Sequence, residues 1–152
     1  MIQRSQTLFL LGAFILAVLM LTGPLATLTG LDVPLELKHS GLFSETGEKQ
    51  DLATWPLTAL FAAVSLLSFL NVFSYRNRSR QMRLCVFLML VSAGSMGMIF
   101  YYIWIAGQRF SSGDILYNWR IVIPLIIIVL IYLAFRGIRR DEATIKAFDR
   151  IR

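Results

Sequence analysis

The chain has 152 residues, of which 57% are hydrophobic and 16% charged, and its mean hydropathy is +0.66. A soluble domain is about 45–50% apolar and about 25% charged, so this composition excludes an ordinary water-soluble globule and indicates a protein embedded in lipid. The net charge of +6 comes from short basic runs beside apolar segments, which are typical of membrane topology and not of nucleic-acid binding. The single Cys85 excludes an internal disulfide, a CxxC redox pair and a thiolate metal cage.

Four apolar segments reach the roughly 20 residues that a membrane-spanning helix needs. The fourth has only 15 uncharged residues between Arg120 and Arg136, so it must start near Ile115 and leave Arg120 at the interface. The first could be a cleaved signal peptide, but its length and the lack of an Ala-x-Ala site favour a retained span. We therefore predict an all-α integral membrane protein, a single-domain bundle with four transmembrane helices at 8–29, 57–75, 84–108 and 115–135.

The distribution of Lys and Arg predicts the orientation of these spans. The N-terminus, the loop 76–83 and the tail 136–152 hold one, four and six basic residues, against four on the other side. Because basic loops stay in the cytoplasm, both termini are predicted to be cytoplasmic. The long loop 30–56 is then extracytoplasmic, and it holds five of the nine acids.

The outer loop 30–56 is the only long segment that lipid does not force into a helix. VPLELKHSGLF shows partial alternation of apolar and polar residues, SETGEK is rich in turn formers, and QDLATW is a second short extended piece. This pattern predicts a small two-stranded β-hairpin on the outer ends of the helices. The third loop, RFSSGDILYNW, is predicted to be a short connector.

We predict no catalytic residue, no cofactor and no metal site. His39 is the only histidine, and Glu36 and Glu45 are not at ligand spacing from it. The first three spans contain no Asp, Glu, His, Lys or Arg, which disfavours a proton relay and leaves their serines without an activating base. Near the cytoplasmic end of the second span, Asn71 and Tyr75 are expected to form hydrogen bonds across helices or to the arginine loop.

Small residues recur at four-residue spacing within the second and third spans. The pairs are Ala59 with Ala63 and Ala93 with Gly97, and we expect them to pack helices inside the bundle, the alternative being a face for a partner subunit. Aromatic residues near the outer end of the third span fit an interfacial belt, the alternative being a lipid or quinone pocket: Phe100, Tyr101, Tyr102 and Trp104.

The inner loop and the tail carry the candidate contact residues. The loop has four arginines in eight residues, which suit topology anchoring or contact with lipid headgroups or a partner: Arg76, Arg78, Arg80 and Arg83. The tail is predicted to be a short amphipathic helix that docks on those arginines or lies on the membrane surface. Its candidate contact residues are Asp141, Glu142, Phe148 and Asp149.

Four segments together resemble a family of small four-span inner-membrane proteins of unknown function found in Bacteroidota. They are MIQRSQTLFLL at the start, TWPL, the loop YRNRSRQMRLC and the ending RRDEATIKAFDRIR. The resemblance covers the whole chain in order, and its loop and C-terminal motifs are the most specific. It implies a bacterial inner-membrane protein with four helices, and it brings no catalytic or binding residues.

These observations favour a non-catalytic accessory, scaffold or assembly subunit of a bacterial inner-membrane complex. Its expected partners are membrane lipids and membrane-protein subunits, without nucleic acid. The alternative is a membrane protein that binds or transports a small molecule, a quinone or a lipid, and an enzyme ranks third. Packing residues and charged faces are present, whereas buried ionisable groups are lacking.

Overall fold

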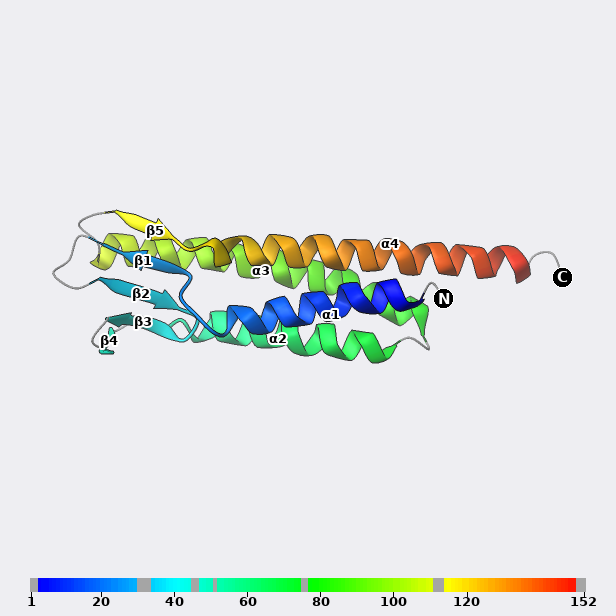
Figure 1. Ribbon diagram of the computed structural model, residues 1–152, viewed down its shortest axis with the longest axis horizontal. Helices are drawn as coiled ribbons and strands as arrows, with labels where there is room; N and C mark the ends of the chain where they lie inside the picture. The colour runs from blue at the N-terminus through cyan, green and yellow to red at the C-terminus, as the bar shows by residue number, and fades with distance from the viewer. Residues whose placement is uncertain are drawn as a thin grey trace.

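The computed structural model describes residues 3–29, 34–44, 47–50, 52–74, 77–110 and 114–149. In this part of the chain, four long helices lie side by side and a small sheet lies at one end (Figure 1). Each helix packs against its two neighbours in the ring α1–α2–α3–α4. The helices are α1 (Gln3–Met20), α2 (Trp55–Phe73), α3 (Arg78–Phe110) and α4 (Ile123–Asp149).

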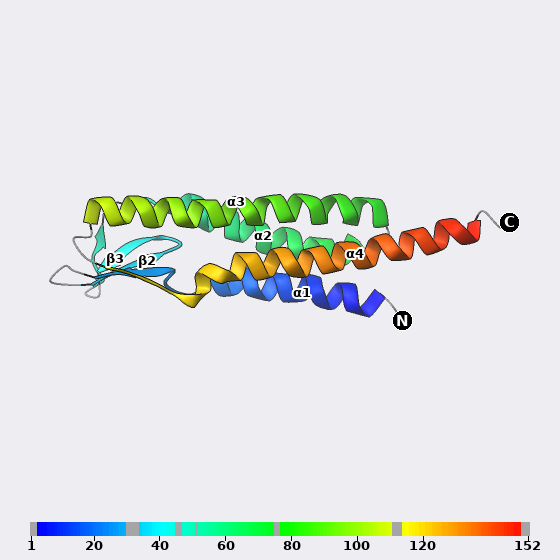
Figure 2. The same cartoon turned by 90° about the horizontal axis from the view of Figure 1, so that it is seen from above.

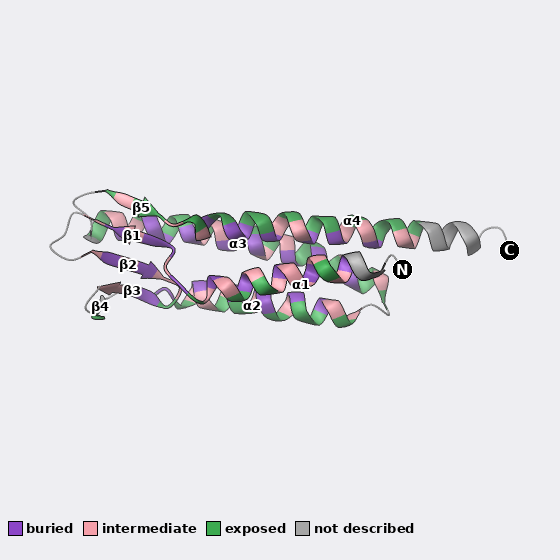
Figure 3. Ribbon diagram, in the orientation of Figure 1, coloured by how far each residue is buried: buried purple, intermediate pink, exposed green. Residues whose placement is uncertain are grey.

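Three of the helices, α2, α3 and α4, are long and apolar enough to cross a membrane. The apolar part of α1, Gln6–Met20, is shorter. Buried residues recur every three or four positions, as on α4 with Ile123, Ile127 and Ile131, because that spacing keeps them on one face of a helix (Figure 3). Large apolar side chains are also exposed on the outward faces of all four helices, a pattern that suits lipid and not water.

The predicted first span, 8–29, is too long. The helix ends at Met20, because Gly23 and Pro24 follow and the residue before a proline avoids helical backbone angles. The apolar residues that follow, Ala26–Leu28, form strand β1 instead. Their hydrophobicity serves the core of a sheet, with Leu28 fully buried.

The segments between α1 and α2 and between α3 and α4 form a five-stranded antiparallel sheet of order β4-β3-β2-β1-β5. The predicted all-α fold with at most one hairpin is therefore wrong in this region. The segment predicted as one strand turns back at His39 and Ser40 and forms both β2 and β3, and QDLATW contributes only the end of β4. Besides β1, the strands are β2 (Leu35–Lys38), β3 (Gly41–Ser44), β4 (Lys49–Gln50) and β5 (Ile115–Tyr117).

The third loop is also not a plain connector, because it supplies the edge strand β5. Its residues pair with β1, where Thr27 lies opposite Leu116. The fourth helix accordingly does not start near Ile115. A 3₁₀ turn at Trp119–Val122 follows β5, and α4 begins at Ile123.

The sheet lies beside the C-terminal part of α3 (Figures 1 and 2). This helix therefore runs along both the bundle and the sheet. With 33 residues, α3 is about 50 Å long, whereas α1 and α2, with 18 and 19 residues, are about 27–29 Å long. Gly107 allows the close contact, since a Cβ there would lie 2.9 Å from Cδ1 of Ile115 in β5. Leu25, Leu37 and Leu42 are fully buried in the sheet core.

The predicted helical tail is continuous with α4. This helix runs for 27 residues to Asp149 and projects beyond the ends of the other three helices (Figures 1 and 2). Ile138 is still buried in the bundle, so the first turn of the predicted tail packs against the other helices.

Candidate functional site

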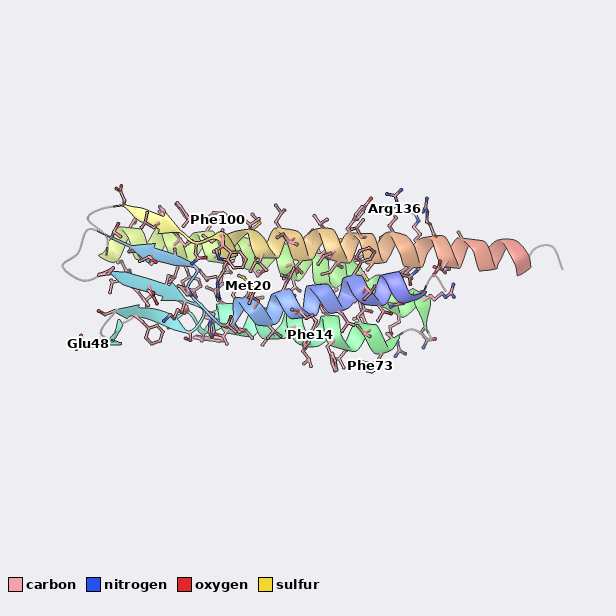
Figure 4. All side chains as sticks on the ribbon, in the orientation of Figure 1. Phe14, Met20, Glu48, Phe73, Phe100 and Arg136 are labelled. Atoms are coloured by element: carbon pink, nitrogen blue, oxygen red, sulfur yellow. The ribbon has the colours of Figure 1, made fainter. Side chains whose placement is uncertain are left out.

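Basic residues gather at the end of the bundle opposite the sheet, which we call the basic end. Two acids predicted as contact residues, Asp141 and Glu142, lie there on α4. In Figure 4, nitrogen-bearing side chains gather at this end around Arg136, whereas Glu48 lies at the sheet end. Three of the predicted arginines lie in the first two turns of α3: Arg78, Arg80 and Arg83.

The remaining predicted contact residues are not placed. Tyr75, Arg76 and the side chains of Phe148 and Asp149 lie outside the described part of the chain.

Three hollows open at the basic end and share arginine side chains. A central cavity of about 350 Å³, with residues from all four helices in its wall, is lined by both Arg78 and Asp141. A groove of about 500 Å³ between α3 and α4 is lined by both Arg83 and Glu142. A third hollow, also about 500 Å³, is lined by all three α3 arginines, Arg80 included. The structure therefore brings the predicted loop and tail residues to one end and into shared cavities.

In the central cavity, the tail is joined to α1. Nε2 of Gln6 donates a hydrogen bond to Oδ2 of Asp141 at 2.6 Å. Among the described side chains, no ion pair joins Asp141 to Arg78, and Nη1 of Arg78 is buried without a hydrogen-bond partner. Asp141 thus connects α4 to the first helix and not to the arginines of α3.

We expect Asp141→Ala to lower the free energy of unfolding by about 1–2 kcal/mol, because a hydrogen bond to a half-buried carboxylate is lost. Denaturation in mixed detergent micelles measures this change. Gln6→Met should cost a similar amount, and the double variant little more than either one. Fully additive losses would show that the two side chains are not coupled.

Polar groups also line the contact between α2 and α3. Nδ2 of Asn71 donates to Sγ of Cys85 at 3.2 Å, and Nε2 of Gln81 donates to the backbone oxygen of Asn71 at 3.3 Å. The predicted cross-helix hydrogen bonding of Asn71 is therefore confirmed. Oδ1 of Asn71 and the hydroxyls of Ser68 and Ser92 are buried without partners in the described structure.

The small residues predicted to pack inside the bundle lie mostly outside its core. Ala59, Ala93 and Gly97 are exposed, and Ala63 is half-buried. A Cβ added at Gly97 would meet no atom within 4 Å, so no helix of this chain packs there. Four serines of α2 and α3 are buried instead: Ser65, Ser68, Ser92 and Ser95.

At the sheet end, Arg120 holds the end of α1. Its Nη1 donates to the backbone oxygen of Leu19 and to Oγ1 of Thr22, both at 3.2 Å. A cation at this position also complements the negative end of the helix dipole. Sequence reasoning placed Arg120 at a membrane interface but missed this contact, because the residues involved are about 100 positions apart.

The turn between β2 and β3 is fixed to the start of α2. The hydroxyls of Thr54 and Thr58 each donate to the backbone oxygen of His39 at 2.9 Å. The His39 ring is half-buried, and Nδ1 has no hydrogen-bond partner. Burial, and then the charge of Lys38, lower the pKa of His39 below its usual 6.5.

This lowered pKa predicts that acid weakens the contact between the β2–β3 turn and the start of α2. A histidine with a lowered folded pKa contributes its full stability above the unfolded pKa of 6.5 and loses it as the pH falls toward the folded value. The unfolding temperature should therefore fall between pH 7.5 and pH 5.5, and it should fall less in His39→Gln. Equal pH dependence in both proteins would refute a contribution from His39.

The side chains at the basic end are suited to binding anions. Guanidinium groups supply several fixed donors each and match phosphate and carboxylate oxygens. In the part of the chain that the structure describes, no three His, Cys, Asp or Glu side chains form a group that could hold a metal ion.

Comparison with protein families gives one match. Residues 2–151 match the model of a family described as a domain of unknown function, DUF4293. No curated protein and no solved structure matches the chain significantly. Since the family match covers nearly the whole chain, the chain belongs to this family.

Proposed function

We propose that this DUF4293 protein is a non-catalytic accessory or assembly subunit of a bacterial inner-membrane complex. In this proposal it spans the membrane four times, and its sheet binds a partner subunit on the extracytoplasmic side. The apolar open edge of the sheet is the observation that supports it most directly.

All four helices fit a membrane-spanning role, α1 included. It lies alongside α2 and has nearly the same length, 18 against 19 residues (Figure 1). Its outward face carries Leu8 and Ile15, which are more than 60% exposed. Apolar side chains on that face would be unfavourable in water, so lipid on the outside of α1 is the consistent environment.

An aromatic belt supports a lipid boundary between bundle and sheet. Trp55 begins α2 and Trp119 begins the 3₁₀ turn before α4, and both are exposed. Phe100 of α3 is also exposed. Tyr101 and Trp104 are also exposed, which fits a belt better than an enclosed quinone pocket, whereas Tyr102 is buried and does not belong to the belt.

Beyond this belt, strand β5 forms an open edge of the sheet with apolar side chains. Leu116 and Tyr117 are about 60% exposed, at 59% and 63%. The opposite edge strand, β4, consists of Lys49 and Gln50, and polar or charged residues are the usual protection against edge-to-edge association. The β5 edge lacks that protection. A partner with an apolar extended segment would cover Leu116 and complete the hydrogen bonding of the edge.

Site-specific photo-crosslinking in intact cells tests this proposal. A crosslinking residue at Tyr117 should capture one defined membrane protein, and the same residue at Glu48, on the other side of the sheet, should not. That protein should also stay bound during gentle detergent extraction. In Leu116→Lys its recovery should fall several-fold, because the new charge would be buried in the contact.

Glu48→Lys provides the matched control, since it adds positive charge to the sheet away from β5. The proposal fails if both lysine variants retain the partner equally. It also fails if the wild-type chain is recovered alone in several gentle detergents.

The proposed orientation has its own test. Reporter fusions after Arg83 and after Arg152 should report the cytoplasm, and a fusion at Gly47 should report the outside, because basic loops remain inside. A cytoplasmic signal at Gly47 would refute this topology.

A further inference from the structure

The groove between α3 and α4 at the basic end is lined by charged side chains and by apolar side chains, and we call the apolar part its floor. Its floor includes Met82 and Val86 of α3 and Phe135 of α4. Arg83 and Arg139 line the same groove from opposite helices, and both are exposed. Two separate helices therefore present one guanidinium each around a space of about 500 Å³.

The charge of the groove favours an anion. Glu142 is the one acid in its lining, against Arg83 and Arg139. The adjoining hollow shares Arg83 and adds Arg78 and Arg80 without any acid in its lining. Guanidinium groups from two sides can share the oxygens of one phosphate.

The floor distinguishes a lipid from a soluble anion. Beyond Val86, the next turn of α3 exposes Leu90, and beyond Phe135 the next turns of α4 expose Tyr132 and Val129. All are at least half exposed and belong to the outward faces that suit lipid. An acyl chain can thus leave the groove along an apolar surface, whereas inorganic phosphate would leave the floor uncovered.

We propose that the groove between α3 and α4 binds one anionic phospholipid, with its phosphate between Arg83 and Arg139 and an acyl chain over Val86 and Phe135. This site requires that the protein is embedded in a membrane, and it is independent of the partner proposed for the β5 edge. Bound lipid would join α3 to α4 at the level where α4 leaves the bundle.

Native mass spectrometry of the purified full chain tests the site. The protein is mixed in detergent micelles with equal amounts of phosphatidylglycerol and phosphatidylcholine that have identical acyl chains. Wild type should retain one phosphatidylglycerol with a preference of about ten-fold, because only phosphatidylcholine adds a positive choline group next to the phosphate, which the two arginines repel. The variant Arg83→Gln with Arg139→Gln should lose this preference.

The control variant is Arg109→Gln with Arg136→Gln, which removes the same charge from exposed positions outside the lining of the groove. It should keep the preference. Val86→Trp, which fills the floor but keeps both arginines, should lose the bound lipid, and an excess of inorganic phosphate should not displace lipid from wild type.

Three outcomes would overturn the proposal. Equal retention of the two lipids by wild type would exclude an anion-selective site. An equal loss in both double variants would show only a general effect of net charge. Displacement of the lipid by inorganic phosphate, with binding unchanged in Val86→Trp, would indicate a soluble-anion site. A thermal unfolding curve for each variant confirms that the variants tested are folded.

Discussion

Gly23→Ala is expected to lower the free energy of unfolding by about 1.5–3 kcal/mol, although it adds only one methyl group at an ordinary backbone position. A Cβ at this position would lie 2.5 Å from Cζ of Arg120. The arginine must then move away and lose its hydrogen bonds to Leu19 and Thr22. The Leu19 carbonyl would keep its hydrogen bonds from the backbone N–H and the hydroxyl of Thr22. The cost is therefore the loss of a charged donor at the negative end of α1.

A double-mutant cycle separates this mechanism from simple crowding. Arg120→Ala should cost about as much as Gly23→Ala, and Gly23→Ala should cost almost nothing once Arg120 is alanine. The free energies are measured by denaturation in mixed detergent micelles. If Gly23→Ala is equally destabilising with and without the arginine, the steric account involving Arg120 is wrong.

Leu37→Ala is expected to cost about 2–5 kcal/mol, the range for removing a leucine from a packed core. Leu37 is fully buried in β2, opposite Ala26 of β1. Loss of its side chain leaves a cavity in the centre of a small sheet whose strands are only two to four residues long. Hydrogen exchange of the strand amides should accelerate, whereas exchange in the helices should change little.

Leu116→Ala is the matched control for Leu37→Ala. Leu116 is 59% exposed on the edge strand, so its truncation should change stability by less than about 0.5 kcal/mol. Under the proposed function it should instead weaken partner recovery. Equal destabilisation by the two changes would show that Leu116 is buried in the folded protein.

Much of the helical structure could be predicted from the sequence. Long uncharged segments predict helices in lipid because a spanning backbone must satisfy its own hydrogen bonds. The second and third predicted spans fall within α2 and α3 apart from residues 74 and 75, and the described part of the tail, up to Asp149, is helical as predicted. In the structure Arg83 and Glu142 line one groove, and their role in contacts with a partner or with lipid headgroups stays a prediction.

The sequence predicted less well which face of each helix packs inside the bundle. The spacing of Ala93 and Gly97 fits close helix contact, yet the structure exposes both and buries Ser92 and Ser95. In lipid, the outward face of a helix is as apolar as its inward face, so hydrophobicity alone does not give its rotation. A buried polar residue such as Asn71 was the better signal, because it must find a partner inside the bundle.

The sequence by itself determined that this protein is suited to lipid, that it is mostly helical, and that most of its basic residues lie in the loop 76–83 and the tail 136–152. Only the tertiary structure decided that Ala26–Leu28 and Ile115–Tyr117 are neighbouring strands. Each is a short apolar piece that reads equally well as the end of a membrane span, and the two are nearly 90 residues apart. Strands gain their hydrogen bonds from other segments of the chain, so a strand this short has no stable local structure and is defined by the partner that folding brings beside it.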